Sequence, residues 1–293
     1  MLIKDIIKEK GPTISFEIFP PKNDYPLEKL YNTIEELKDL NPDFISVTYG
    51  AGGSTKDRTV EIASKIKNDI GIETMAHLTC LNSSENQLDN VLKTLKENNI
   101  ENILALRGDY PSSGEVINGD FSYAKDLVNY INSKDSSYSL GGACYPEGHI
   151  ENENMVDDLR KLKEKCDSGL DFLITQLFFD NELFYQFLEK LELLNIKIPV
   201  IPGILPVLSI KQVKTIQKLS GCNLPPKFLR ILDKYEDNPI ALKEAGIAYA
   251  TEQIIDLISY GVDGIHLYTM NKSKETREIF SRISNIRDSF SKV

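Results

Sequence analysis

Short apolar runs alternate with amphipathic segments along nearly the whole chain of 293 residues. The runs are rich in β-branched and aromatic residues and almost continuous in hydrophobicity, which is typical of parallel strands covered by helices. The segments between them carry apolar residues at helical spacing. The pattern therefore predicts repeated strand–helix units, with strands at Thr13–Phe19, Phe44–Tyr49, Thr74–Cys80, Asn102–Leu106, Gly141–Tyr145, Phe172–Phe178, Ile198–Ile204 and Gly264–Tyr268.

Local signals predict where several helices begin and end. Ser84-Glu-Asn-Gln87 has the pattern of a capping box, which opens a helix. Ser209 is expected to cap another helix, and Gly169 to end a third. The long segment Pro225–Tyr260 separates the last two strands and is predicted to hold two helices.

Eight strand–helix units without a Pro/Ser-rich linker predict an α/β fold, a single (β/α)8 TIM barrel that residues 1–293 form as one catalytic domain. The alternative is a doubly wound sheet, which normally stops near six strands. The chain ends soon after the eighth unit, so no regulatory domain is expected.

Acidic residues outnumber basic ones, with 44 Asp and Glu against 34 Lys and Arg and a formal net charge of −10. Nucleic acids and anionic membranes require clustered Lys and Arg, so neither is expected as a partner. No apolar run approaches the roughly 18 residues that span a bilayer. The first ten residues lack the apolar core of a signal peptide. We therefore expect a cytoplasmic protein.

The four cysteines and three histidines do not form a recognisable metal motif. No two cysteines have the C-x-x-C spacing, so zinc binding is not expected. No cysteine stands in a nucleophile motif, and reduced thiols are expected in the cytosol. The sequence predicts no metal site.

Polar residues occur where the predicted strands end, which is where such a barrel carries its chemistry. Side chains alternate between the two faces of a strand, so Ile14, Phe16 and Ile18 share one face and Ser15 and Glu17 the other. The apolar set belongs against the helices. Glu17 is therefore predicted to point into the mouth of the barrel.

The same alternation brings further polar side chains to this rim. A carboxylate, an imidazole, a guanidinium and an amide are expected to converge there. The residues concerned are Ser46 with Thr48, His77 with Thr79, Arg107 with Asp109, and Gln176 in the row of Phe172 and Ile174.

Each of these residues also has a purely structural interpretation. Glu17 could be a solvated charge at a strand end, and His77 a half-buried histidine with satisfied hydrogen bonds. Arg107 and Asp109 could pair only with each other. Gln212 lies three residues after a capping serine, and by sequence alone we interpret it as part of a helix cap.

The glycine-rich segment Gly50-Ala-Gly-Gly-Ser-Thr55 lies between a predicted strand and a helix. Its backbone N–H groups could hold a phosphate, but it matches neither G-x-G-x-x-G nor a P-loop. A simple turn explains the segment equally well.

Nine short motifs at these strand ends resemble the methylenetetrahydrofolate reductase family, whose members are flavin-dependent folate enzymes. The motifs follow the family order and cover almost the whole chain. They are Phe16-Glu-Ile-Phe-Pro-Pro21, Ser46-Val-Thr-Tyr-Gly-Ala51, Asp57-Arg-Thr59, His77-Leu-Thr-Cys80, Leu104-Ala-Leu-Arg-Gly-Asp109, Tyr145-Pro-Glu-Gly-His149, Thr175-Gln-Leu-Phe-Phe-Asp180, Ile201-Pro-Gly-Ile-Leu-Pro206 and Leu267-Tyr-Thr-Met-Asn271.

The resemblance implies that 5,10-methylenetetrahydrofolate is reduced to 5-methyltetrahydrofolate by hydride transfer from reduced FAD. NADH, NADPH or another electron donor, including a partner protein, would reduce the flavin in ping-pong turnover. Opening the folate ring to an iminium cation needs a general acid, which by similarity is Glu17. Phe16, Ile18 and Phe19 are expected to exclude water from this carboxyl so that it holds a proton near neutrality.

The resemblance also assigns further residues to the site. Asp109 is implied as a second catalytic group beside the flavin and folate rings, and Gln176, Gln212 and Lys272 as substrate contacts with Glu17. Family members commonly assemble, so a homo-oligomer is left open. The implied FAD contacts are Thr48, Tyr49, Ala51, His77, Arg107, Gly108, Asp109, Tyr123, Ala124, Tyr145, His149, Asp158 and Lys165.

Two features depart from the family pattern. Acidic Glu164 lies beside Lys165, where the family often has adjacent basic residues, and Gly52-Gly53 adds flexibility to the second loop. Two other functions stay open: an FAD barrel dehydrogenase acting on a small amino acid such as proline, and a non-catalytic folate- or flavin-binding subunit of a methyl-transfer complex.

Overall fold

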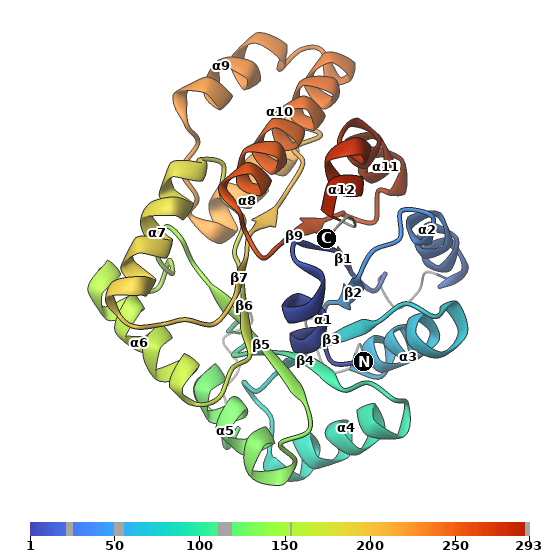
Figure 1. The fold of residues 1–293 in the computed structure, drawn as a ribbon, viewed down its shortest axis with the longest axis vertical. Helices are drawn as coiled ribbons and strands as arrows, with labels where there is room; N and C mark the ends of the chain where they lie inside the picture. The colour runs from blue at the N-terminus through green and yellow to red at the C-terminus, as the bar shows by residue number, and fades with distance from the viewer. Residues whose placement is uncertain (22–25, 50–55, 111–118, 153, 291–293) are drawn as a thin grey trace.

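Parallel strands form one sheet that is wrapped into a barrel with helices around it (Figure 1). The structure, a computed structural model, describes residues 1–293 except 22–25, 50–55, 111–118, 153 and 291–293. The strands of the described residues are β1 (Thr13–Ile18), β2 (Phe44–Val47), β3 (Thr74–Thr79), β4 (Asn102–Leu106), β5 (Ser139–Cys144), β6 (Phe172–Thr175), β7 (Val200–Ile201), β8 (Gly203–Ile204) and β9 (Gly264–Tyr268). The predicted α/β barrel is confirmed.

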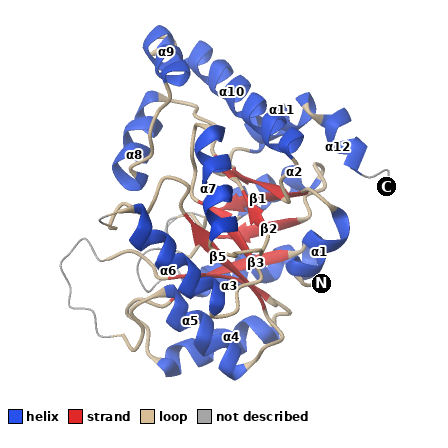
Figure 2. Ribbon diagram, turned by 60° about the vertical axis from the view of Figure 1, so that its left-hand side comes forward, coloured by secondary structure: helices blue, strands red, loops and turns tan. Residues whose placement is uncertain are grey.

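One or more helices follow most of the strands, and most helices lie around the sheet (Figure 2). They are α1 (Ile3–Lys10), α2 (Glu28–Lys38), α3 (Lys56–Ser64), the π-helical η2 (Lys65–Ile70), α4 (Glu85–Glu97), α5 (Ala124–Lys134), α6 (Met155–Asp167), α7 (Asn181–Leu193), α8 (Ile210–Ser220), α9 (Pro226–Tyr235), α10 (Pro239–Tyr260), α11 (Ser273–Arg282) and α12 (Ser284–Phe290).

The seventh barrel position differs from the prediction of one continuous strand. It is split into β7 and β8 on either side of Pro202, which has no N–H to donate to a neighbouring strand. β7 pairs with β6, whereas β8 pairs with β9, and the Pro202 carbonyl accepts a hydrogen bond of 3.0 Å from the His266 N–H. The broken strand therefore joins the two ends of the sheet.

Two of the three apolar clusters formed by the described residues follow from the alternation of side chains along the strands. Phe16 and Ile18 belong to the larger cluster, which lies between the sheet and the surrounding helices. A second cluster joins α1 to the barrel interior through residues such as Ile3, Phe44 and Phe172. Figure 1 shows α1 across the centre of the barrel. This helix closes the end where the strands begin, so the opposite end remains for the polar side chains.

The predicted helix signals are confirmed. Ser84 and Gln87 form the capping box of α4, and Ser209 caps α8 by accepting a hydrogen bond from the Gln212 N–H. α6 ends two residues before Gly169, whose φ of 106° suits glycine. The segment Pro225–Tyr260 holds α9 and α10. In the part of the chain that the structure describes, no helix is long and apolar enough to cross a bilayer.

Candidate active site

A carboxyl and two imidazoles from three different strands meet inside the barrel. Glu17 Oε2 lies 3.5 Å from His77 Nε2 on β3 and 3.7 Å from His266 Nε2 on β9. The Glu17 side chain is only 20% exposed. Glu17 thus lies where the alternation of side chains places it, close to the predicted His77 and to a histidine that the sequence analysis did not select.

Burial determines the protonation state of His77. Removal from water lowers its pKa to about 4, against the opposing effect of the Glu17 charge. His77 Nε2 is buried and makes no hydrogen bond to any described residue. The contact with Glu17 is therefore between a carboxyl and a neutral imidazole at neutral pH, and not an ion pair.

His266 is fully buried, and two serine hydroxyls lie beside its ring. Ser15 Oγ is 2.8 Å from Nδ1, and Ser46 Oγ is 3.4 Å from Nε2. The signal that could have revealed His266 is its register, because it pairs with Ser15 across β1 and β9, two residues before Glu17.

The expectation that Phe16 and Ile18 exclude water from Glu17 is wrong. Both side chains lie on the opposite face of β1, and the Phe16 ring packs edge-on against Phe280 of α11 at 5.1 Å. Residues adjacent in a strand point to opposite sides. Polar groups from β3 and β9 surround the carboxyl instead.

Tyr268 and Gly203 shape the barrel interior next to this cluster. The Tyr268 hydroxyl donates a hydrogen bond of 2.6 Å to the Thr175 carbonyl. A Cβ at position 203 would come within 2.6 Å of the Tyr268 ring and 2.4 Å of the Thr175 carbonyl oxygen. Only glycine at this position leaves room for the Tyr268 ring. The nearby Gln176 accepts a hydrogen bond of 2.9 Å from the Leu177 N–H through its side-chain oxygen.

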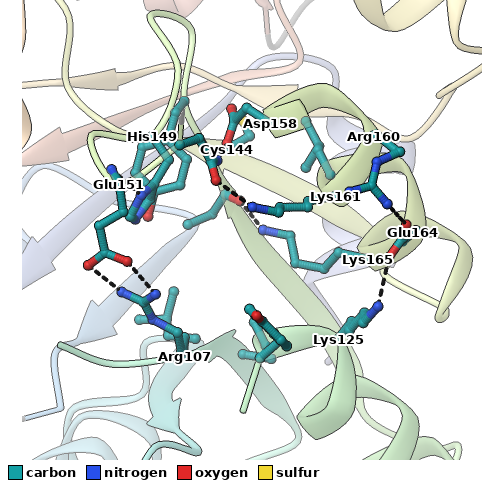
Figure 3. A pocket seen from close by; sticks show the side chains of 18 of the residues that line it. Arg107, Lys125, Cys144, His149, Glu151, Asp158, Arg160, Lys161, Glu164 and Lys165 are labelled. Atoms are coloured by element: carbon teal, nitrogen blue, oxygen red, sulfur yellow. Dashed lines mark hydrogen bonds and ion pairs between the residues drawn. The ribbon is translucent and has the colours of Figure 1, made fainter. Parts of the chain in front are cut away.

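A second region is an open pocket of about 470 Å³ whose lining includes the ends of β4 and β5 and parts of α5 and α6 (Figure 3). Among the described residues, five cationic side chains line it together with three carboxyl groups and the rings of Tyr110, Tyr123 and Tyr145. The cations are Arg107, Lys125, Arg160, Lys161 and Lys165, and the acidic residues are Glu151, Asp158 and Glu164.

Arg107 pairs with Glu151 and not with Asp109. The two guanidinium nitrogens lie 2.5 and 2.8 Å from the two Glu151 oxygens, and these hydrogen bonds raise the Arg107 pKa. The interpretation of an Arg107–Asp109 pair is therefore wrong. The positions of Arg107 and Glu151 are 44 apart, so the sequence offered no signal for this pairing.

The side chain of Glu164 does not neutralise its neighbour Lys165. It accepts hydrogen bonds from Lys125 at 2.7 Å and Arg160 at 2.8 Å. Lys165 extends into the pocket and donates to the neutral carbonyl of Ala143 (Figure 3), and burial lowers its pKa. The acidic residue at position 164, where the family pattern often has a basic one, therefore leaves the Lys165 amino group directed at the pocket.

His149 and Asp158 line the same pocket. His149 Nδ1 accepts a hydrogen bond of 3.1 Å from the Glu151 N–H, and its ring packs edge-on against Tyr145 at 4.6 Å. Burial lowers the His149 pKa and raises the Asp158 pKa. Both shifts have the same cause, because burial penalises the charged form of a side chain.

Seven of the implied FAD contacts line this pocket. Of the other implied contacts, Thr48 and Tyr49 follow β2, and Gly108 and exposed Asp109 follow β4. Ala51, like the rest of the Gly50–Thr55 segment, lies outside the described residues. The pocket contacts are Arg107, Tyr123, Ala124, Tyr145, His149, Asp158 and Lys165.

The two outer substrate contacts lie on elements after the seventh and eighth strands. Gln212 is occupied by its own helix, since its side chain accepts from the Leu208 N–H at 2.8 Å and donates to the Pro206 carbonyl at 3.1 Å. Exposed Lys272 precedes α11. The helix-cap interpretation accounts for the contacts of Gln212, and its role in substrate binding stays a prediction.

Fold and site place this molecule among α/β-barrel proteins whose chemistry sits where the strands end. Comparison with known proteins gives the family. The model described as methylenetetrahydrofolate reductase matches residues 2–284, and the chain belongs to this family. The resemblance inferred from the nine motifs is thereby confirmed.

Curated relatives match over nearly the whole chain. Methylenetetrahydrofolate reductase (NADH) 1 of Arabidopsis thaliana is 37% identical over 300 residues, which cover 98% of this chain and 51% of the relative. The 5,10-methylenetetrahydrofolate reductase of Escherichia coli is 36% identical over 262 residues, covering 89% and 87%. The chain thus spans about half the length of the plant relatives it matches.

A solved structure has the same fold at low sequence identity. It is an uncharacterized protein from Clostridium thermocellum that binds two copies of 5-methyl-5,6,7,8-tetrahydrofolic acid. The TM-score is 0.63 at 18% identity, with 98% of this chain and 99% of that chain covered. This likeness concerns the barrel fold alone.

Proposed function

We propose that this protein reduces 5,10-methylenetetrahydrofolate to 5-methyltetrahydrofolate, with FAD as cofactor and Glu17 as general acid. The observation that carries the proposal is the Glu17 carboxyl inside the barrel, 3.5 and 3.7 Å from the Nε2 atoms of His77 and His266. Family membership supports the reaction. It supports neither an amino-acid dehydrogenase nor a non-catalytic subunit.

The lining of the outer pocket fits a dinucleotide cofactor. Arg107 and Lys165 would neutralise a diphosphate, and Tyr123 and Tyr145 offer aromatic faces to a ring system. His149 and Asp158, which also line the pocket, would supply further hydrogen-bonding groups. Bound FAD would supply hydride to the folate one-carbon unit.

Glu17 would act on the folate before reduction. Protonation of the nitrogen that leaves the methylene group opens the five-membered ring and yields an electrophilic iminium cation. The carboxylate left on Glu17 then stabilises that cation electrostatically. Neutral His77 next to Glu17 adds no competing positive charge.

The remaining residues of the site would position the two ligands. Asp109 would add a negative charge near the reacting rings, and Gln176 would hydrogen-bond the pterin. Lys272 is exposed beyond the end of β9, where it would bind the anionic tail of folate. Gln212 would contact the outer part of the folate only after exchanging a hydrogen bond of its helix cap.

Two anaerobic measurements test the proposal. The purified chain, supplied with FAD, should be yellow, and 5-methyltetrahydrofolate should bleach the flavin absorbance because the reaction runs in both directions. Stopped-flow mixing with NADH, NADPH and reduced ferredoxin then identifies the electron donor. A colourless protein that binds no FAD after refolding in excess cofactor would overturn the proposal.

A further inference from the structure

His266 is the one histidine of this chain that lies fully buried within the barrel, and the proposed reaction assigns no step to it. Its ring stacks near Phe44 at a centroid distance of 6.2 Å and meets Tyr268 edge-on at 5.4 Å. A polar ring at this depth requires hydrogen-bond partners, because an unpaired buried polar group is costly. Its partners are therefore informative about its role.

The contacts of Ser15 bear on which nitrogen of His266 carries the proton. Ser15 Oγ lies 2.8 Å from His266 Nδ1 and 3.3 Å from the Ile265 carbonyl oxygen, and the hydroxyl has a single hydrogen. Both contacts are hydrogen bonds at once only if the hydroxyl donates to the carbonyl and the Nδ1–H group donates to Ser15. In that arrangement the neutral ring has Nε2 as its acceptor.

That acceptor faces the Glu17 carboxyl. His266 Nε2 lies 3.7 Å from Glu17 Oε2 and 3.4 Å from Ser46 Oγ. The general acid of the proposed reaction carries a proton before it acts, so its O–H group needs an acceptor. Catalytic hydrogen bonds are often long without substrate and shorten in the complex. A shortening of the 3.7 Å contact would let the carboxyl O–H group replace the long Ser46 contact at Nε2.

The backbone of Glu17 is fixed by the same strand end. The Thr269 hydroxyl and N–H both donate to the Glu17 carbonyl, at 2.6 and 3.3 Å. Residue 269 thus fixes the Glu17 main chain, and residue 266 lies beside its carboxyl. His77 on β3 has a neighbouring Nε2 as well, but no hydrogen bond to a described residue orients that atom.

We infer that His266 is a positioning residue for Glu17: its Nε2 accepts the hydrogen bond of the protonated carboxyl, and Ser15 on Nδ1 holds the ring in the required tautomer. During the reaction the proton passes from Glu17 to the departing folate nitrogen. His266 keeps its Nδ1 proton and neither gains nor loses one. The inference rests on the proposed function of Glu17.

The tautomer can be measured without catalysis. The chain has only three histidines, so ¹⁵N-histidine labelling gives few imidazole signals, and His266→Asn identifies the one to assign. At neutral pH we expect the Nδ1–H tautomer in the wild-type protein. Ser15→Ala should shift this equilibrium, whereas Ser139→Ala, the same change at an equally buried serine whose hydroxyl contacts the Lys4 N–H, should preserve it. An Nε2–H tautomer in the wild type would overturn the inference.

Half-reaction kinetics test the consequence for Glu17. His266→Asn keeps a donor toward Ser15 but loses the Nε2 acceptor, and it should slow the folate half-reaction roughly 10- to 100-fold with little change in flavin reduction by the donor. His266→Gln, which offers an oxygen near the Nε2 position, should recover most of the rate. Equal rates in the wild type and both variants, or equal loss in both half-reactions, would refute the positioning role.

The experiments distinguish a failure of the proposed function from a failure of the positioning role of His266. A wild-type protein that binds FAD but does not turn over folate refutes the proposed function, whatever the tautomer. A wild-type protein that turns over folate, with His266→Asn unchanged, refutes only the role of His266. Should His266→Asn not fold, His266→Gln and Ser15→Ala supply the same comparison.

Discussion

The interior cluster around Glu17 and the outer pocket around Arg107 differ in how they handle charge. In the interior, one carboxyl lies next to two imidazoles, and burial lowers the His77 pKa to about 4. In the outer pocket, five cationic side chains face solvent-accessible space and several are paired with carboxylates. The first region is suited to holding and moving a proton, whereas the second is suited to binding an anion.

The difference follows from where the side chains originate. The interior groups stand on the strands β1, β3 and β9, whose backbone is fixed by the barrel hydrogen bonds. The pocket groups stand mainly on α5, α6 and the loops after β4 and β5 (Figure 3). Rigid elements hold catalytic groups precisely, and longer side chains at a rim adapt to a ligand.

The largest expected effect comes from removing the acid. Glu17→Gln should slow the folate half-reaction by about 10²–10⁴-fold, because the amide cannot deliver a proton. Flavin reduction by the electron donor should stay within a few-fold of the wild type. Anaerobic stopped-flow absorbance of the flavin measures both steps. An equal loss of rate in the two half-reactions would show that Glu17 does not act specifically in the folate half-reaction.

The next effect concerns the anion-binding pocket. Lys165→Met should weaken FAD binding about 10- to 100-fold, the effect of losing a charged hydrogen bond of about 1.5–3 kcal/mol. Lys163→Met is the matched control, since Lys163 is on the same helix but pairs with Asp167 outside the pocket. Flavin fluorescence titration gives both dissociation constants. Similar weakening in the two variants would argue against a specific contact by Lys165.

Acid should destabilise the apoprotein through His77. The folded-state pKa of about 4 lies below the unfolded value of 6.5, so the unfolded chain binds more protons between these values and stability falls as pH decreases. From pH 7.5 to 5 the loss attributable to this group is about 2 kcal/mol. Urea unfolding at both pH values should show this additional loss in the wild type relative to His77→Gln. The same pH dependence in both proteins would place the titration elsewhere.

The smallest effect is expected at the rim. Glu151→Gln removes the negative charge that pairs with Arg107, so an incoming diphosphate no longer competes with it. Glu151 is 45% exposed, which limits the change to a few-fold tighter FAD binding, on the order of 0.5 kcal/mol. The gain should shrink when the titration is repeated at high salt. Weaker binding in the variant would mean that Glu151 orients Arg107 for the ligand.

The comparison also shows how far sequence reasoning reaches. It predicted Glu17 and His77 on one rim because strand alternation is local and regular. It did not select His266, since a histidine in an apolar strand carries no sign of facing a carboxyl 249 positions away. It misjudged the surroundings of Glu17 by treating neighbours along the chain as neighbours in space. The split of the seventh strand was also missed, although Pro202 was visible in its middle.

The sequence by itself determined the order of strands and helices, the capping of α4 and α8, and the family motifs at the strand ends. These depend on local periodicity, local hydrogen bonds and residue identity. Only the tertiary structure decided that Arg107 pairs with Glu151, that Glu164 turns away from Lys165, and that Ser15 and His266 lie beneath Glu17. Closing the barrel brings β9 beside β1, and that closure depends on the whole chain.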